Sequence, residues 1–367
     1  MKIRACVLHG KGDVRIDTRE VGNVGPKQVR VRIGAGGLCG SDIHYFWDGG
    51  IGTIQVSEPI ILGHEVAGTV EAVGGEVANV KPGDRVALCP SLPCGHCRFC
   101  QIGQQQHCLE MQFFGSAMRK PHCNGGFRDE IIVEDFQCEP VGNIGLDEAA
   151  CAEPLSVGLH AINNAGSVFG KRVLVMGAGP IGALLVGAAK LAGAQEIVAV
   201  DLADAPLAAA VKMGANSTVN ARTEPDRLAS LYSADKGYFD AGFECTGVDI
   251  ALGNMFPVVK PRGTIVAVRQ QRSPRSLQRP GRQGDTPRRH ASLSCRISDR
   301  GADDRGATRR CASDHHRDAA DGPYSRRFRP RARSLIADEG ATDFRDVERR
   351  DRNQNGRNNE YDDYDGQ

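Results

Sequence analysis

The stretch KRVLVMGAGPIGALLVGAAKLAG, residues 171–193, contains three patterns that decide the fold of the second half of the chain. The apolar run RVLVM is typical of a buried strand, and the alanine-rich segment after the glycines has the apolar repeat of a helix. Between them, GAGPIG supplies Gly177, Gly179 and Gly182 at G-x-G-x-x-G spacing. A strand, a glycine turn and a helix in this order predict the start of a Rossmann-like sheet.

The next segment supports a dinucleotide site at the glycine turn, whereas the turn alone would also fit a simple tight turn. EIVAVD reads as a strand that ends at Asp201, nineteen residues after Gly182. The glycines would let a pyrophosphate approach the helix N-terminus, where Pro180 and Ile181 lie, and the Asp201 carboxylate would accept hydrogen bonds from ribose hydroxyls. Because that carboxylate repels a 2′-phosphate and no arginine follows in DLADAP, we expect NAD in preference to NADP.

The rest of the pattern predicts two domains. The runs FDAGFECTG and GTIVAV continue an alternating α/β pattern, which indicates a parallel sheet covered by helices. Before residue 150, short alternating stretches such as QVRVRIGAGG and EVAGTVEAVGGEV are separated by glycines, which favours a small twisted barrel or sandwich. We therefore expect a β-rich domain over residues 1–150 and a doubly wound α/β domain over residues 151–268.

The composition changes at residue 269. Of the 36 arginines, 23 lie in residues 269–367, and no lysine follows Lys260. Only eleven of these 99 residues are Leu, Ile, Val, Met, Phe, Tyr or Trp, which is too few to form a hydrophobic core. Our hypothesis is that this segment is a frameshifted, disordered tail, and that the parallel sheet ends with the strand GTIVAV. A basic arm that binds nucleic acid is the alternative, but the many aspartates and the scarcity of stacking aromatics disfavour it.

The overall charge and the cysteine usage exclude several classes of protein. A formal net charge of +1 gives no general attraction to nucleic acid or anionic lipid. The first residues lack the apolar region of a secretory signal, and no run of about 18 apolar residues would span a bilayer. Thirteen cysteines, an odd number with clusters at metal-ligand spacing, suit a reducing compartment. We expect a cytoplasmic protein with a small-molecule partner and neither nucleic acid nor membrane as a partner.

Four cysteines predict a structural metal site. Cys94, Cys97, Cys100 and Cys108 form C-x2-C-x2-C-x7-C, and this spacing lets four thiolates converge on one Zn²⁺ at about 2.3 Å. Four thiolates complete the coordination shell, so this zinc would stabilise a lobe and leave no position for a substrate. An iron–sulfur cluster and scattered free thiols are the alternatives.

A thiol, an imidazole and a carboxylate predict a second metal site. Cys39 lies in the glycine-rich turn GLCGSDIHYF, and His64 and Glu65 follow an apolar strand in ILGHEVAG. Three protein ligands leave one coordination position open, as a catalytic zinc requires. An ordinary surface His–Glu pair is the alternative.

Together these motifs resemble the medium-chain zinc-dependent alcohol dehydrogenase family over residues 1–268. GHEVAGTVEAVGGEV matches the zinc signature of that family, KPGDRV follows it, and CGSDIHY and AEPLSVGLHA lie at the expected places. The resemblance implies a GroES-like catalytic domain before the Rossmann domain, two zinc ions per chain, NAD, and a homo-oligomer, either a dimer or a tetramer. Glu65 after His64 and the segment AEPLSVGLHA point to the polyol branch, in which Glu153 lies at the zinc or holds its water.

The resemblance also implies how a secondary alcohol would lose its proton and hydride. Zinc is a Lewis acid that stabilises the alkoxide. Ser41 can accept the alcohol proton and His44 can carry it further, although a turn-stabilising hydroxyl and a hydrogen-bonded histidine are the alternatives. In this family the loop after FECTG borders the nicotinamide, so Thr246 and Gly247 are further candidates, with a simple strand-end turn as the alternative.

The substrate expectation rests on two stretches. FFGSAMRKPHCNGGF and KGYFDAGFECTG most resemble the L-idonate 5-dehydrogenases, so the expected reaction is oxidation of L-idonate at C5 to 5-ketogluconate. A sorbitol or xylitol dehydrogenase and a non-catalytic zinc- and nucleotide-binding protein are the alternatives. Arg119 and Lys120 are candidates to bind the substrate carboxylate, against the alternative of two solvated loop cations.

Overall fold

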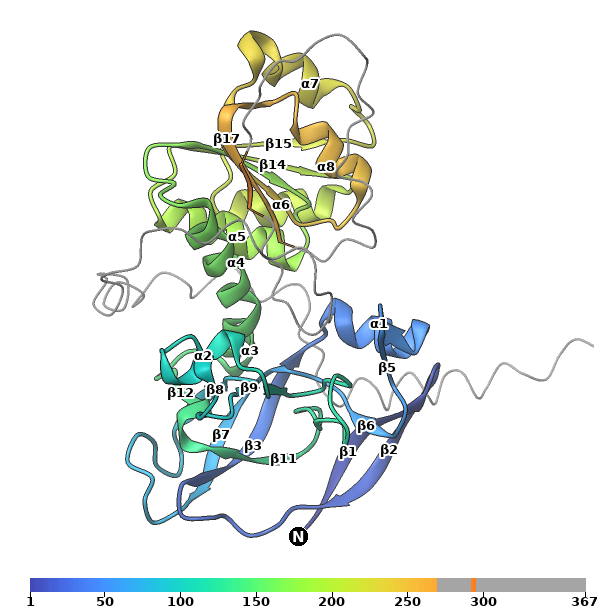
Figure 1. The fold of residues 1–367 in the computed structure, drawn as a ribbon, viewed down its shortest axis with the longest axis vertical. Coiled ribbons are helices and arrows are strands. Elements are labelled where there is room, and N and C mark those ends of the chain that lie inside the picture. Colours follow the sequence, from blue (N-terminus) through green and yellow to red (C-terminus); the bar gives the residue numbers. More distant parts are fainter. Residues whose placement is uncertain (269–291, 295–367) are drawn as a thin grey trace, which may run out of the picture. The chain divides into compact units, whose positions relative to one another are not determined.

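The computed structural model describes residues 1–268 and 292–294. The chain divides into two compact units, of which unit 1 comprises Met1–Glu153 and unit 2 begins at Pro154 (Figure 1). The boundary expected from the sequence, at residue 150, lies three residues before this division. Apart from Ser292–Ser294, the predicted tail from residue 269 to 367 lies outside the described residues.

Unit 1 consists mainly of antiparallel strands. These are β1 (Lys2–Gly10), β2 (Asp13–Glu20), β3 (Gln28–Gly37), β4 (Gly50–Ile51), β5 (Ile54–Gln55), β6 (Ile60–Ile61), β7 (Glu65–Val73), β8 (Arg85–Leu88), β9 (Ser91–Leu92), β10 (Gln112–Phe113), β11 (Glu130–Glu134) and β12 (Cys138–Pro140). Its helices are α1 (Gly40–Asp48), α2 (Arg98–Gln101) and α3 (Leu146–Ala150), and α4 (Ala152–Ala165) begins at the division between the units. The largest sheet has the order β11-β3-β7-β8-β12, and a second has the order β2-β1-β6.

The pairing of β3 with β7 positions two of the segments selected from the sequence. Along β3, Val29 and Val31 are fully buried, as the alternation of a strand with one face on the core requires. The antiparallel register sets Gly37, the last residue of β3, opposite Glu65, the first residue of β7. A side chain at position 37 would overlap the Glu65 carboxylate, which accounts for the glycine. The chain therefore reaches Cys39 only two residues after this pair.

Unit 2 is built around a parallel sheet. Its strands are β13 (Arg172–Met176), β14 (Glu196–Asp201), β15 (Ser217–Asn220), β16 (Phe239–Glu244), β17 (Val259–Ala267) and β18 (Ser292–Ser294). Its further helices are α5 (Pro180–Leu191), α6 (Asp204–Met213), α7 (Arg227–Tyr232) and α8 (Asp249–Met255). The strand order β15-β14-β13-β16-β17-β18 is that of a Rossmann sheet, so the predicted doubly wound fold is confirmed.

The apolar run of β13 is continuous because both faces of its sheet are covered. Val173 and Val175 pack in a core with residues of α4, α5 and α6, whereas Leu174 and Met176 pack in a second core with residues of α7 and α8. Successive side chains of a strand point to opposite faces, so a strand buried on both faces reads as uninterrupted hydrophobic sequence. Figure 1 shows the helices on either side of this sheet.

The edge of the parallel sheet differs from the expectation. The sequence predicted that the sheet ends with β17, but β18 continues it by pairing in parallel with Thr264–Val266 of β17. This three-residue segment is too short to show the alternation of a longer strand, so no sequence pattern indicated it.

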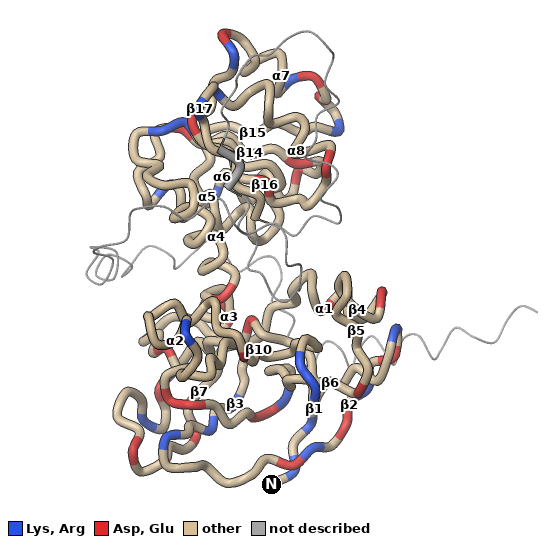
Figure 2. The backbone as a smooth tube through the Cα atoms, in the orientation of Figure 1, with Lys and Arg blue, Asp and Glu red and all other residues tan. Residues whose placement is uncertain are grey.

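Charged residues of both signs are interleaved along the described part of the chain (Figure 2). Along β2, Arg15 pairs with Asp13 and Arg19 pairs with Asp17. Exposed pairs of this kind contribute little to stability. None of the helices within the described residues combines the length and the apolar character needed to cross a membrane.

Candidate functional site

Three side chains of the predicted catalytic metal site converge in unit 1. One ligand atom each from Cys39, His64 and Glu65 lies within 4.8 Å of the other two. His64 and Glu65 are buried and Cys39 is half-buried. The β3–β7 register accounts for this convergence, because it holds the end of one strand, just before Cys39, beside the start of the other.

Asp42 is a residue of this site that the sequence analysis missed. Its side chain is 2% exposed; Oδ2 accepts a hydrogen bond from the Cys39 backbone N–H at 3.0 Å, and Oδ1 accepts one from the Gly63 N–H at 3.1 Å. The same Oδ1 lies 3.9 Å from Nδ1 of His64. One carboxylate thus joins the turn of Cys39 to the turn of His64. Asp42 could have been predicted from its position, because an acidic residue three positions after a helix N-cap often accepts a hydrogen bond from the N-cap N–H.

The electrostatics of the cluster favour a cation. Burial raises the pKa of Cys39 to about 11 and that of Asp42 to about 6. Burial and then the negative charge of Glu153 raise the pKa of Glu65 to about 7. A divalent cation among these groups would offset the cost of ionising them, and one sulfur, one nitrogen and one oxygen donor with a fourth position open suit zinc. The residues present therefore fit a zinc ion.

The other predicted catalytic residues lie outside this three-residue convergence. Glu153, at the start of α4, is not part of the three-residue convergence, although its charge acts on Glu65. The Ser41 side chain is near enough to Cys39 to lower the pKa of its thiol, against the larger opposite effect of burial. His44 is oriented along α1 by Asp48, whose Oδ2 lies 2.7 Å from the His44 Nδ1. The proton relay through Ser41 and His44 stays a prediction.

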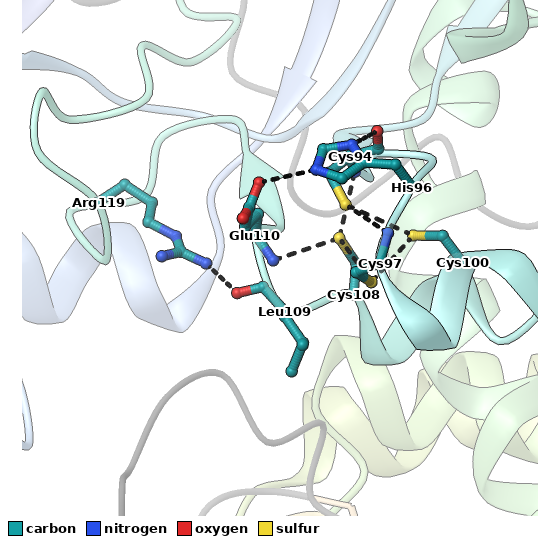
Figure 3. A network of polar contacts seen from close by, with 8 residues as sticks. All are labelled: Cys94, His96, Cys97, Cys100, Cys108, Leu109, Glu110 and Arg119. Carbon is teal, nitrogen blue, oxygen red and sulfur yellow. Dashed lines mark hydrogen bonds and ion pairs between the residues drawn. The ribbon is translucent and has the colours of Figure 1, made fainter.

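The four cysteines form a second cluster, shown in Figure 3. The sulfur of Cys100 lies 3.5 Å from that of Cys97 and 4.0 Å from that of Cys94, and Cys97 lies 4.0 Å from Cys108. A tetrahedral zinc with four bonds of about 2.3 Å requires sulfurs about 3.8 Å apart. The N–H groups of Cys94 and Glu110 donate to the Cys108 sulfur, as they would to a thiolate. This cluster also fits zinc.

The two predicted substrate cations occupy unlike surroundings. The Arg119 guanidinium donates to the Leu109 carbonyl oxygen (Figure 3). Its Nε also donates to the Met111 carbonyl oxygen at 3.4 Å. These bonds connect Arg119 to the segment that follows Cys108. Lys120 is exposed. A role for either residue in binding a carboxylate stays a prediction.

In unit 2 the glycine turn lies at the point where the strand order reverses. Gly177 follows β13 with φ +91°, and a Cβ there would stand 2.6 Å from Cγ2 of Thr246, which follows β16. A Cβ on Gly182 would overlap the Gly177 carbonyl oxygen, whereas one on Gly179 would meet nothing in the described chain within 4 Å. The open side at Gly179, the N-cap of α5, fits a pyrophosphate at the helix N-terminus.

Two further predicted residues, Pro180 and Ile181, begin helix α5 directly after this turn. Proline suits the first helical position because its missing N–H would have no partner there. Asp201 ends β14, and its Oδ2 accepts a hydrogen bond from the Ala178 N–H at 2.8 Å. The acidic residue thus holds the glycine turn as well as lying at the place predicted for a ribose.

Glu244 is a second residue that the sequence analysis missed. It is fully buried, and its carboxylate accepts hydrogen bonds from the Thr246 N–H at 2.6 Å, from the Thr246 hydroxyl and from the Gly247 N–H at 3.0 Å. The Thr246 hydroxyl in turn accepts the Val248 N–H at 3.0 Å. These bonds fix the loop that faces Gly177. The Glu244 carboxylate binds backbone groups of the turn that directly follows it. The short sequence ECTG was therefore the feature from which this residue could have been predicted.

Comparisons with known proteins agree with this geometry. The model of the alcohol dehydrogenase GroES-like domain matches residues 25–143, which confirms the predicted GroES-like domain, and that of the zinc-binding dehydrogenases matches residues 180–276. The L-idonate 5-dehydrogenase (NAD(P)(+)) of Escherichia coli K12 is 39% identical over 269 residues, covering 73% of this chain and 77% of the relative. The sorbitol dehydrogenase of Bacillus subtilis is 37% identical over 269 residues, covering 72% of this chain and 74% of the relative. The crystal structure of the Escherichia coli L-idonate 5-dehydrogenase has a TM-score of 0.67 and covers 73% of this chain and 76% of its own.

The four-cysteine cluster generates a prediction about metal content. Replacing Cys100 with serine removes a sulfur ligand and should lower the zinc content by one ion per chain, as measured by atomic emission on the purified protein. Cys89→Ser is the matched control, because Cys89 is exposed and lies outside the cluster. Iron and sulfide in place of zinc would contradict the zinc assignment.

Asp42 generates a prediction about stability. In Asp42→Asn one acceptor oxygen becomes an NH₂ group that faces a backbone N–H, so the free energy of unfolding should fall by about 1–3 kcal/mol. Urea unfolding followed by fluorescence of Trp47, the single tryptophan, reports on α1 itself. The exposed Asp13→Asn should change the midpoint far less. Equal changes in the two variants would show that Asp42 does not join the two turns.

Proposed function

The chain belongs to the family of zinc-binding alcohol dehydrogenases with a GroES-like domain, and from this premise we propose that it oxidises L-idonate at C5 to 5-ketogluconate with NAD. The relatives support the coarser activity of an NAD(P)-dependent polyol or sugar-acid dehydrogenase. Zinc and a nicotinamide dinucleotide are the cofactors typical of the family. The choice of L-idonate follows the relative of 39% identity that is named for that substrate.

The observation that carries the proposal is the convergence of Cys39, His64 and Glu65 within 4.8 Å. These three residues would hold the catalytic zinc, and the four-cysteine cluster defined above would hold the second. A zinc ion at the catalytic position supplies a Lewis acid that makes a hydroxyl easier to deprotonate. Glu153, whose charge acts on Glu65, would keep the site anionic and so favour a divalent cation.

Residues of the chain would carry the proton of the substrate hydroxyl to solvent. Oxidation of a secondary alcohol to a ketone releases one hydride, which reduces NAD to NADH, and one proton. The Ser41 hydroxyl beside Cys39 would accept that proton, and His44 on the same helix would pass it to solvent while Asp48 orients its ring. In unit 2, Gly177, Gly179 and Asp201 would bind the dinucleotide.

The test is a comparison of substrates with the full chain loaded with zinc. NADH formation measured by absorbance should give a kcat/KM for L-idonate at least tenfold above those for sorbitol and xylitol. A higher kcat/KM for sorbitol or xylitol would replace the proposal with a polyol dehydrogenase. Zinc and NADH binding without turnover of any of the three substrates would replace it with a non-catalytic binding protein.

Lys120 allows a test of the carboxylate site. Its ammonium is exposed, whereas Arg119 already donates to two carbonyl oxygens, so Lys120 is the more available cation. Lys120→Ala should raise the KM for L-idonate about tenfold through loss of one charged hydrogen bond, with a far smaller effect on the KM for sorbitol. Lys81→Ala, an exposed lysine of the same unit, is the control. Equal effects of Lys120→Ala on both substrates would refute the assignment.

A further inference from the structure

The end of β15 brings an arginine to the place where the sequence predicted none. Asp201 and Asn220 are register partners at the carboxyl ends of β14 and β15, and the Ala221 N–H donates to the Asp201 carbonyl oxygen at 2.8 Å. Arg222 follows, and its Nε donates to the Leu202 carbonyl oxygen at 3.2 Å. The guanidinium therefore lies beside the residue that directly follows the predicted ribose-binding carboxylate.

Asn220 sets this position. Its Oδ1 accepts the backbone N–H groups of Arg222 at 3.0 Å and Thr223 at 3.3 Å, and its Nδ2 donates to the carboxylate of Asp204 at 2.6 Å. A side-chain turn of this kind reverses the chain immediately after the strand. It directs Arg222 back toward the end of β14, and it gives the neighbouring Asp204 a neutral partner.

The hydrogen bonds of Asp201 leave limited room for a ribose. Its Oδ1 accepts the N–H groups of Leu202 at 2.7 Å and Ala203 at 3.1 Å, and its Oδ2 accepts that of Ala178. A carboxylate has about four acceptor positions, so about one is left for a ribose hydroxyl. Arg222, by contrast, is an exposed residue, and its terminal guanidinium nitrogens have no hydrogen-bond partner among the described residues.

We infer that Arg222 is a specificity-determining residue that lets this site accept NADP in addition to NAD, an inference that rests on the proposed dinucleotide site. A carboxylate at this place binds the ribose hydroxyls of NAD, whereas a nearby arginine accommodates the 2′-phosphate of NADP. The planar guanidinium can donate two parallel hydrogen bonds to one phosphate group, in a bidentate arrangement. Asp201 keeps NAD the preferred form, and Arg222 reduces the penalty for the 2′-phosphate.

The experiment measures coenzyme binding to the full chain without substrate. Nicotinamide fluorescence gives the Kd for NADH and for NADPH, and competition with 2′,5′-ADP tests the phosphate directly. In Arg222→Ala the ratio of NADPH affinity to NADH affinity should fall about tenfold or more, as expected for loss of a charged hydrogen bond to phosphate. Arg222→Lys should give a ratio between those of the wild type and Arg222→Ala, because lysine keeps the positive charge but cannot form the bidentate hydrogen bonds.

The matched control is Arg227→Ala, an exposed arginine of the same unit that pairs with Glu224 and should leave the ratio unchanged. No measurable NADPH binding by the wild-type chain, or an equal loss of both coenzymes in Arg222→Ala, would overturn the inference while the dinucleotide site stands. Failure of the wild-type chain to bind NADH would remove the proposed dinucleotide site and this inference with it.

Discussion

The candidate metal site depends on the register between β3 and β7. Because Gly37 pairs with Glu65, the end of one strand and the start of the next bring together segments that are 25 or more residues apart in sequence. The Asp42 carboxylate then connects the two turns that follow from this pairing through the N–H groups of Cys39 and Gly63. A buried carboxylate with two donors and a histidine nearby is costly unless all its partners are present. The same contacts therefore fix the geometry and make it sensitive to single changes.

The two metal clusters of unit 1 differ in the distance along the chain over which they form. The four cysteines lie within fifteen residues, and their spacing alone allows the sulfurs to meet. Cys39, His64 and Glu65 meet only because a sheet aligns their segments. The four-cysteine cluster leaves no open coordination position and is suited to stabilising a loop. Arg119 adds hydrogen bonds to the same loop, through the carbonyl oxygens of Leu109 and Met111. The non-local cluster keeps a position open and is suited to chemistry.

In unit 2 the proposed dinucleotide site lies where the strand order reverses, between β13 and β16. The first glycine of the turn meets Thr246, and the buried Glu244 holds Thr246 in place through the backbone of its own loop. On the other side of β13, Asp201 binds the backbone of the same turn. Two carboxylates, at the ends of the strands on either side of β13, thus hold the glycine turn and the loop that faces it. Arg222, just after the end of β15, lies beside Leu202 and would add a positive charge to the proposed dinucleotide site.

The sequence by itself determined the features that depend on local spacing. The two-residue alternation of Val29 and Val31, the continuous run of β13, the glycine turn and the four cysteines each specify a local conformation or a local cluster. Tertiary structure decided the rest, since Asp42 reaches Gly63, twenty-one residues away, and β18 pairs with β17, contacts that no periodic pattern in the sequence indicates. Arg222 is the clearest example. No arginine directly follows Asp201 in the sequence, but parallel pairing brings Arg222 from the end of the adjacent strand, twenty-one residues along the chain. This happens because the carboxyl ends of adjacent parallel strands meet at one edge of the sheet.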